Sequence, residues 1–310
     1  MEKVPLVIIN SPTATGKTEL AINLALEFGG EIISADSLQV YRYLDIGTAK
    51  PSKEQRNKVK HHMLDVVDPD EEFNAAFFAE QARIIIADLA RQGKPVFVVG
   101  GTGLYIRALL RGIIDTPDVD ENIRNHYRQL RESHGKEYLH DLLQKRDQDA
   151  AGKINSNDSV RVIRALEVLE QTGESILAIQ KRHSFTDCPY KTYKIGIQID
   201  RKELKQRVIM RTEKMIAEGL LDEVKNILDR GYSYKLKPLQ SLGYKQVIGF
   251  LRKEYDWGNA LNLIKRDTWQ YAKRQMTWFA ADKEINWFKP DLFAEIRKNV
   301  EKYWKDCTPA

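Results

Sequence analysis

The sequence predicts an α/β fold with a parallel-sheet core, an inserted helical domain and a largely helical C-terminal part. Three observations predict it. Up to residue 101, short β-rich runs alternate with helical stretches, which is typical of βαβ units. The run "KPVFVVGG" (94–101) is almost continuously apolar, as expected of a strand that is buried on both faces of a parallel sheet. From 118 to 187 charged helical segments replace the strands, and "KTYKIGIQID" (191–200) restores the strand pattern.

The elements follow from local patterns along the chain. We expect strands at 5–10 ("PLVIIN"), 31–35 ("EIISA"), 61–67 ("HHMLDVV"), 94–101, 191–200 and 284–288 ("EINWF"). We expect helices at 16–29, 74–92 and 291–304, and over most of 201–283. Asn74 is a helix-capping residue type, and Gly29 and Gly93 are typical of helix ends. Residues 1–117 and 188–310 are therefore predicted to form the core, with 118–187 as the insertion.

Composition sets only broad limits. The chain has 310 residues, enough for one or two domains, and 42% of them are hydrophobic. No apolar run approaches the roughly 20 residues that cross a bilayer, so we expect no membrane span and a cytosolic protein. Cys188 and Cys307 are far apart in the sequence, which argues against a cysteine-rich zinc site. A net charge of +5 is weak support for a nucleic-acid partner.

The run "INSPTATGKT" (9–18) is the first candidate site. A strand, a tight turn and a Gly-Lys-Thr at a helix start predict a P-loop and hence a P-loop NTPase-like core. Backbone N–H groups and the helix N-terminus favour phosphate, Lys17 reaches the outer phosphate, and the Thr18 hydroxyl suits Mg²⁺. The expected diphosphate-binding residues are Ser11, Thr13, Ala14, Thr15, Gly16, Lys17 and Thr18. Ser11 stands where glycine is usual, and the alternative is a glycine turn that only begins a helix.

Asp36 follows the second strand, at the sheet edge where ligands of parallel sheets lie. We interpret it as a general base, with Ser37 and Gln39 placed to contact a base or sugar. The alternatives are a helix cap or the metal-holding acid of a kinase. No N-K-x-D string for guanine is present, and the strand "PVFVVGGTG" ends without an acid, which disfavours a standard NTPase.

Two further positions belong to this edge. Thr102 follows the glycine turn after 94–101, where it is either a helix cap or a substrate contact. Arg211 interrupts an apolar stripe formed by Leu204, Val208 and Met215. A guanidinium there needs an anion, and a diphosphate would supply one. The alternative is an arginine that reaches solvent or pairs with Glu203 or Glu213.

Basic and aromatic residues suggest a nucleic-acid partner. Arg161 and Arg164 lie on one side of a helix that begins near Asp158. The stretch "KRDTWQYAKRQMTWF" (265–279) alternates cations with aromatic rings, which can hold phosphates and stack on bases. A helix whose aromatic side chains pack in the core and whose charged side chains face solvent would have the same pattern. "SLGYKQ" (241–246) is equally ambiguous by itself.

Taken together, these motifs resemble one family, the bacterial tRNA dimethylallyltransferases, also called tRNA isopentenyltransferases. The matching strings are "SPTATGKT", "ADSLQVYRYLDIGTAKP", "HHMLDVVDP", "FVVGGTGLYIRALL", "NDSVRVIRALEV", "RVIMRTEKMIAEGL", "SLGYKQ" and "YAKRQMTWF". They run in the family's order from about residue 9 to 279.

The resemblance implies transfer of a dimethylallyl group from dimethylallyl diphosphate to N6 of the adenosine 3′ to the anticodon, position 37 of tRNA. It implies Mg²⁺ as cofactor, and we expect a monomer. The implied catalytic residues are Asp36, Lys17, Thr18 and Arg211, with Arg211 also binding the donor. The implied tRNA contacts are Asp36, Ser37, Leu38, Gln39, Thr102, Arg124, Val160, Arg161, Val162, Ile163, Arg164, Gly243, Tyr244 and Lys245. The insertion would contact the anticodon arm.

Three other functions stay open at this point. An adenylate isopentenyltransferase would prenylate free AMP, ADP or ATP. A P-loop small-molecule kinase would transfer phosphate from ATP. A noncatalytic RNA-binding protein would retain the loop without using it. The basic-aromatic helix and the insertion favour tRNA over a free nucleotide.

Overall fold

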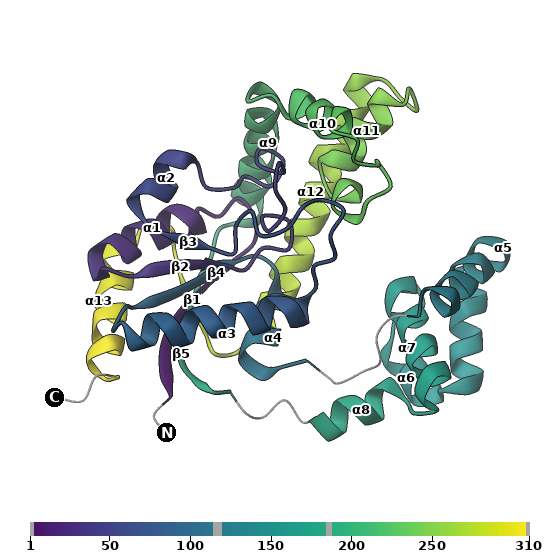
Figure 1. The fold of residues 1–310 in the computed structure, drawn as a ribbon, viewed down its shortest axis with the longest axis horizontal. Coiled ribbons are helices and arrows are strands. Elements are labelled where there is room, and N and C mark those ends of the chain that lie inside the picture. Colours follow the sequence, from purple (N-terminus) through teal and green to yellow (C-terminus); the bar gives the residue numbers. More distant parts are fainter. Residues whose placement is uncertain (1–2, 114–119, 184–187, 308–310) are drawn as a thin grey trace. The chain divides into compact units, whose positions relative to one another are not determined.

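The computed structural model describes residues 3–113, 120–183 and 188–307. The chain divides into two compact units, and each is described here by itself. The first comprises Met1–Leu110 and Cys188–Ala310, and the second comprises Arg111–Asp187. Figure 1 shows the sheet in the first unit and only helices in the labelled part of the second.

The first unit is built on a six-stranded sheet in the order β3-β2-β4-β1-β5-β6. The strands are β1 (Val4–Asn10), β2 (Glu31–Ser34), β3 (His61–His62), β4 (Val96–Gly100), β5 (Tyr190–Ile197) and β6 (Ile285–Phe288). Every pair of neighbours is parallel, with β1 between β4 and β5. All six strands therefore present their carboxyl ends at one edge, where the loops after β1, β2 and β4 meet.

Helices surround this sheet (Figure 1). They are α1 (Lys17–Phe28), α2 (Lys53–Lys58), α3 (Ala75–Arg91), α4 (Gly103–Arg111), α9 (Arg201–Ala217), α10 (Leu220–Asp229), the 3₁₀ helix η1 (Lys237–Gln240), α11 (Tyr244–Leu251), α12 (Trp257–Ala280) and α13 (Phe293–Lys305). Asn74 caps α3 by accepting hydrogen bonds from two backbone N–H groups, as its residue type predicts. Gly29 ends α1 in the left-handed conformation that favours glycine.

The core of this unit joins strands that are distant in sequence. Val7, Phe97 and Ile195 come from β1, β4 and β5 and are fully buried in one cluster. Leu24 of α1 and Ile296 of α13 pack into the same cluster, so the closing helix completes a layer begun by the first one. This rigid layer holds the loop between β1 and α1.

The second unit contains α5 (Glu121–Arg146), α6 (Gln148–Lys153), α7 (Ser159–Thr172) and α8 (Ile176–His183). Its own core includes Tyr127, Leu139 and Leu166, which are almost fully buried. Gly135 breaks the helical dihedral angles inside α5, so this element consists of two helical segments joined at a kink.

The predicted α/β class with a P-loop-like parallel core is confirmed, and the expected strands and helices are present. The strand expected at 61–67 is shorter, because regular pairing with β2 covers only His61 and His62. A single bridge from Tyr41 to Val67 continues that edge. Residues 118–119 and 184–187 of the predicted insertion lie outside the described residues.

Candidate active site

The loop between β1 and α1 has the shape of an anion-binding turn. Ala14 and Gly16 both have positive φ, at 66° and 91°. Such left-handed residues turn successive backbone N–H groups toward one point, which forms a nest for phosphate oxygens. The hydroxyl of Thr15 donates to the carbonyl oxygen of Pro12 at 2.9 Å and fixes the turn from within. Lys17 and Thr18 then begin α1, whose N-terminus adds positive potential.

Ser11 has a structural explanation. Its φ lies outside the left-handed region, so this position does not require glycine. Its side chain is fully buried, and its Oγ accepts a hydrogen bond from the backbone N–H of Ile197 at 2.6 Å. The serine therefore ties the loop to the end of β5, which leaves its backbone as the part that can contact a donor.

Asp36 follows β2 and closes a turn at the same sheet edge. Its Oδ1 accepts hydrogen bonds from the backbone N–H groups of Leu38 at 2.9 Å and Gln39 at 3.3 Å. These bonds cap a turn and not a helix, which was the alternative expected from the sequence, because residues 37–40 form turns and the next helix begins at Lys53. They occupy one carboxylate oxygen. Thr102, at the end of β4, accepts a hydrogen bond from the backbone N–H of Ser37 at 3.1 Å. The loops after β2 and β4 therefore hold each other in place.

The charges at this edge interact. Burial and then the nearby Arg211 guanidinium lower the pKa of Lys17 to about 8, while Asp36 acts in the opposite direction. Burial also lowers the pKa of Arg211, again opposed by Asp36. The Nε of Arg211 is buried and has no hydrogen-bond partner among the described residues. Two half-buried cations and one carboxylate thus interact electrostatically, and an added anion would relieve the repulsion between the cations.

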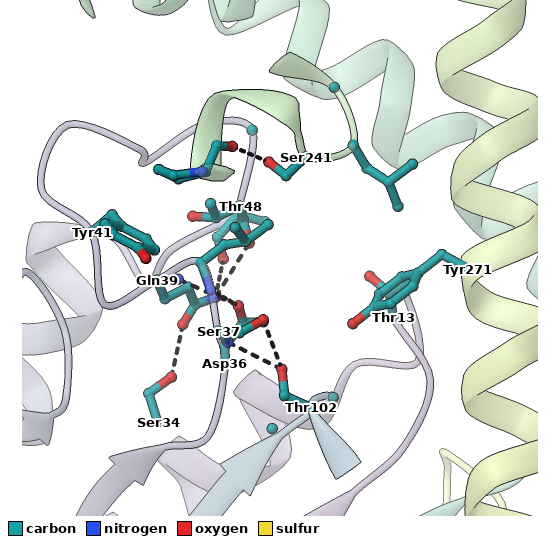
Figure 2. Close-up of a pocket in the computed structure, with 18 of the residues that line it drawn as sticks. Thr13, Ser34, Asp36, Ser37, Gln39, Tyr41, Thr48, Thr102, Ser241 and Tyr271 are labelled. Atoms are coloured by element: carbon teal, nitrogen blue, oxygen red, sulfur yellow. Dashed lines mark hydrogen bonds between the residues drawn. The ribbon is translucent and has the colours of Figure 1, made fainter. Parts of the chain in front are cut away.

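These groups open into one cavity of about 630 Å³ within the first unit. The predicted site residues that line it are Thr13, Lys17, Thr18, Asp36, Ser37, Leu38, Gln39, Thr102, Arg211, Gly243 and Lys245. Figure 2 shows Asp36, Ser37 and Thr102 close together, with Thr13 and Tyr271 across the cavity from Gln39 and Tyr41. A cavity of this size admits a nucleobase together with a small phosphorylated ligand.

The sequence of this chain is similar to those of known proteins. The IPP transferase family matches residues 39–282. A tRNA dimethylallyltransferase 2 of Syntrophus aciditrophicus is 52% identical over 277 residues, 89% of each chain. Another of that name from Geotalea uraniireducens is 49% identical over 98% of each chain. The chain belongs to the IPP transferase family.

Solved structures of related enzymes are similar to the fold of this chain. The tRNA isopentenylpyrophosphate transferase of Bacillus halodurans is 36% identical, with a TM-score of 0.72 over 98% of each chain. A eukaryotic dimethylallyltransferase crystallised acting on tRNA is 27% identical, with a TM-score of 0.81 over 99% of this chain and 80% of that one. The family and the tRNA prenyltransferase activity predicted from the motifs are confirmed.

The carboxylates considered as partners of Arg211 pair with other residues. In this IPP transferase, Glu203 pairs with Arg207 at 2.7 Å and Glu213 pairs with Lys265 at 2.7 Å. Arg211 lines the cavity instead. The geometry thus favours an anionic ligand over a structural salt bridge.

In the segment 241–246, some side chains line the cavity and others are buried in the core. Gly243 and Lys245 line the cavity, and Lys245 lies 3.7 Å from Asp267. Tyr244 is fully buried, and its hydroxyl donates to Glu223 at 2.6 Å. Its side chain is therefore not placed to contact tRNA, in contrast to the expectation from sequence.

Some of the tRNA contacts predicted in the second unit are paired or buried within that unit, and others are exposed. Arg124 and Arg164 both hydrogen-bond the fully buried carboxylate of Glu167, at 2.6 Å and 3.2 Å. Val162 and Ile163 are buried in the core of this unit, which removes their side chains from contact with RNA. The exposed side chains of this segment are those of Val160 and Arg161, and tRNA binding by it stays a prediction.

Helix α12 supplies residues that the sequence did not single out. Gln275 accepts a hydrogen bond from the Thr13 backbone N–H at 2.8 Å and donates to the Gly101 carbonyl oxygen at 2.8 Å. It therefore joins the phosphate loop to the turn after β4. Tyr271 and Arg274 line the cavity beside it. These three residues lie in the string "YAKRQ" (271–275). The alternation of charged and aromatic residues there does not indicate which side chains face the cavity.

Proposed function

We propose that this chain transfers a dimethylallyl group from dimethylallyl diphosphate to N6 of the adenosine 3′ to the anticodon of tRNA. The observation that carries the proposal is that a phosphate loop, a guanidinium and a carboxylate open into one cavity. Relatives named tRNA dimethylallyltransferase that match over most of both chains support the same substrates.

The donor end of the cavity suits a leaving diphosphate. When the allylic C–O bond breaks, its electron pair stays on the ester oxygen of the α-phosphate, so negative charge accumulates on the leaving diphosphate. Lys17, Arg211 and the backbone N–H groups of the loop are placed to stabilise that charge. Because these two cations repel each other, they bind a diphosphate that gains negative charge more strongly than a neutral ligand.

The acceptor end suits an adenine amine. As the N6–C bond forms, N6 becomes positively charged and must lose a proton. Asp36 is the acceptor that we assign, because its Oδ1 is held by the Leu38 and Gln39 N–H groups while Oδ2 remains for the cavity. The base has to leave the stack of the anticodon loop to reach this carboxylate.

The site also fits Mg²⁺. Thr18 lines the cavity at the start of α1, beside oxygen ligands that a diphosphate would provide. Thr18 is the protein ligand that we expect, because the hydroxyl of this P-loop position commonly binds Mg²⁺. In the part of the chain that the structure describes, no cluster of three His, Cys, Asp or Glu could hold a metal. Mg²⁺ commonly combines few protein ligands with substrate oxygens and water. When bound, it would neutralise charge on the diphosphate.

Recognition of tRNA is assigned to two regions. Ser37, Leu38, Gln39, Thr102, Gly243 and Lys245 line the cavity where the flipped base would lie. Residues 118–187 are proposed as the domain that contacts the anticodon arm, with Arg161 as an exposed cation. In the described parts of the chain no helix is long and apolar enough to cross a membrane. The monomeric state and the cytosolic location stay predictions.

The test is a competition. The protein is incubated with dimethylallyl diphosphate, Mg²⁺, an anticodon stem-loop that carries adenosine at position 37, and an equal amount of AMP. Mass analysis of the digested nucleosides should find N6-isopentenyladenosine in the RNA and none on AMP. Prenylation of AMP instead would support the adenylate isopentenyltransferase, and phosphate transfer from ATP to a small molecule would support a kinase.

A further inference from the structure

The loop that follows the Asp36 turn is held by a carboxylate from another helix. Glu223 of α10 accepts hydrogen bonds from three consecutive backbone N–H groups. Its Oε2 accepts from Asp45 at 3.0 Å and from Ile46 at 2.7 Å, and its Oε1 accepts from Gly47 at 3.1 Å. Three N–H groups converging on one anion form the kind of nest that binds phosphate elsewhere. Here the chain fills the nest with its own carboxylate.

Tyr244 joins the same contact from a third segment. Its hydroxyl donates to Glu223 Oε1 at 2.6 Å, and its ring packs directly against Gly47. A Cβ added at Gly47 would lie 2.5 Å from the Tyr244 ring, so the loop approaches this closely only because it has glycine there. Burial and the neighbouring Glu223 carboxylate raise the pKa of Tyr244, which keeps the hydroxyl protonated as a donor.

Glu223 and Tyr244 thereby join two segments that line the cavity, although neither residue lines it. Gly47, Thr48 and Ala49 belong to one segment, and residues 241–243 with Lys245 belong to the other. In Figure 2, Thr48 lies close to Ser241 on the same side as Gln39, whereas Thr13 and Tyr271 lie across the cavity. Gln39 also donates to the Thr48 carbonyl oxygen at 3.2 Å, so the loop is held from both sides.

We propose that Glu223 and Tyr244 are positioning residues for the acceptor. They hold residues 45–49 and 241–245 together as one side of the cavity, and the base enters between this side and the side formed by Thr13 and Tyr271. The contact lies away from Thr13 and the phosphate loop, so its loss affects the use of tRNA and leaves donor binding intact. This inference rests on the proposed function, because it assumes that the acceptor is a nucleobase of tRNA.

The experiment compares Glu223→Gln, Tyr244→Phe and the double variant with the wild-type chain. Steady-state transfer is measured with tRNA varied at saturating donor, and donor affinity is measured separately by calorimetry. Glu27→Gln is the matched control, because Glu27 pairs with Arg297 at 3.1 Å on the surface of α1. Tyr244→Phe keeps the ring that packs on Gly47, so it preserves the fold if Glu223→Gln weakens it. Thermal melting verifies that each variant is folded.

We expect Glu223→Gln to raise KM for tRNA about tenfold, because an amide cannot satisfy all four donors. Tyr244→Phe should raise it about threefold, and the double variant should exceed Glu223→Gln only slightly, since both act through one contact. Donor affinity and kcat should stay within about twofold of wild type in folded variants, as for the control.

Wild-type KM for tRNA in both variants would overturn the inference. So would an equal loss of donor affinity and tRNA affinity, which would indicate a general structural role. A wild-type chain that modifies no tRNA would remove the proposed function, and this inference with it.

Discussion

At the scale of single residues, Lys17 and Arg211 form a pair of cations that repel each other until an anion arrives. The sequence predicts that both bind a diphosphate, but on different grounds. Lys17 is predicted from the loop motif, and Arg211 is predicted from its position in an apolar stripe. The structure adds what neither pattern contains, which is that both interact with Asp36. Their distance from one another depends on α9 folding back over the loop.

Arg211→Ala should damage donor use selectively. We expect KM for dimethylallyl diphosphate to rise about tenfold or more, because a buried charge-assisted hydrogen bond to the diphosphate is lost. KM for tRNA should stay close to wild type. The control is Arg207→Ala on the same helix, which removes only a surface pair with Glu203. An unchanged donor KM in Arg211→Ala would exclude the assigned role.

Donor binding should depend on pH through Lys17. The pKa of Lys17 is lowered to about 8 in the empty site, so the side chain is mainly an ammonium below that pH and loses its proton above it. A bound diphosphate favours the charged form, so binding takes up protons near and above pH 8. Donor affinity measured by calorimetry should therefore fall as the pH rises from 7.5 to 9.5.

Lys17→Arg provides the matched control for this titration. Arginine stays charged throughout that range, so the affinity of the variant should be lower or equal but nearly independent of pH. A wild-type profile that is as flat as that of the variant would contradict the role of the ammonium.

At the scale of elements, α12 shows how far sequence patterns reach. Its alternation of cations and rings was compatible with an RNA-binding face or with a core helix. In the structure, α12 has both a core side and a side that faces the cavity. Ala272 is buried in the core, Lys265 pairs with Glu213, and Tyr271 lines the cavity. Helical period alone could not resolve this, because the side that faces the cavity depends on where α9 and the sheet lie.

Strands and caps were more predictable, because they depend on local chemistry. β1 and β2 lie within one residue of their predicted ranges and β4 within two, and Asn74 caps α3 as expected. The contacts that complete the site were hidden, since they join positions far apart in the chain. Ser11 with Ile197 and Glu223 with Tyr244 are two examples. No local pattern marks such pairs.

The packing of α12 on the glycine turn leads to a stability prediction. A Cβ at Gly103 would lie 2.0 Å from Nε1 of Trp278, so Gly103→Ala forces the indole or α4 to move. We expect a loss of about 1–3 kcal/mol in the free energy of unfolding, measured by urea denaturation. Gly152→Ala is the control, because nothing lies within 4 Å of its added Cβ. A stable Gly103→Ala protein would contradict the close contact.

At the scale of the whole molecule, the chemistry and the pocket for the base are assigned to the first unit, and contact with the anticodon arm is assigned to the second. The cavity and its charged residues belong entirely to the first unit, and the exposed Arg161 belongs to the second. Sequence indicated this division through the change of pattern after residue 117. It could not separate Arg161 from its buried neighbours Val162 and Ile163, which share the same motif.

Arg161→Ala should weaken tRNA binding without affecting the donor. Its guanidinium is 65% exposed and pairs only weakly with Asp158 at 3.3 Å. If it contacts a phosphate, the slope of log K against log salt should decrease by about 1 in the variant. Lys305→Ala on α13 is a charge-matched control that should leave the slope unchanged. Equal slopes for wild type and Arg161→Ala would remove this residue from the interface.

The central claim is that Asp36 accepts the N6 proton in a cavity shared by diphosphate and base. Asp36→Asn tests it directly, because the amide retains an oxygen for the Leu38 and Gln39 N–H groups but cannot serve as the base. Mass analysis of tRNA nucleosides after incubation with dimethylallyl diphosphate and Mg²⁺ should show N6-isopentenyladenosine with wild type and at most a trace with Asp36→Asn, while both bind tRNA and donor comparably. Product formation by Asp36→Asn at the wild-type rate would contradict the account.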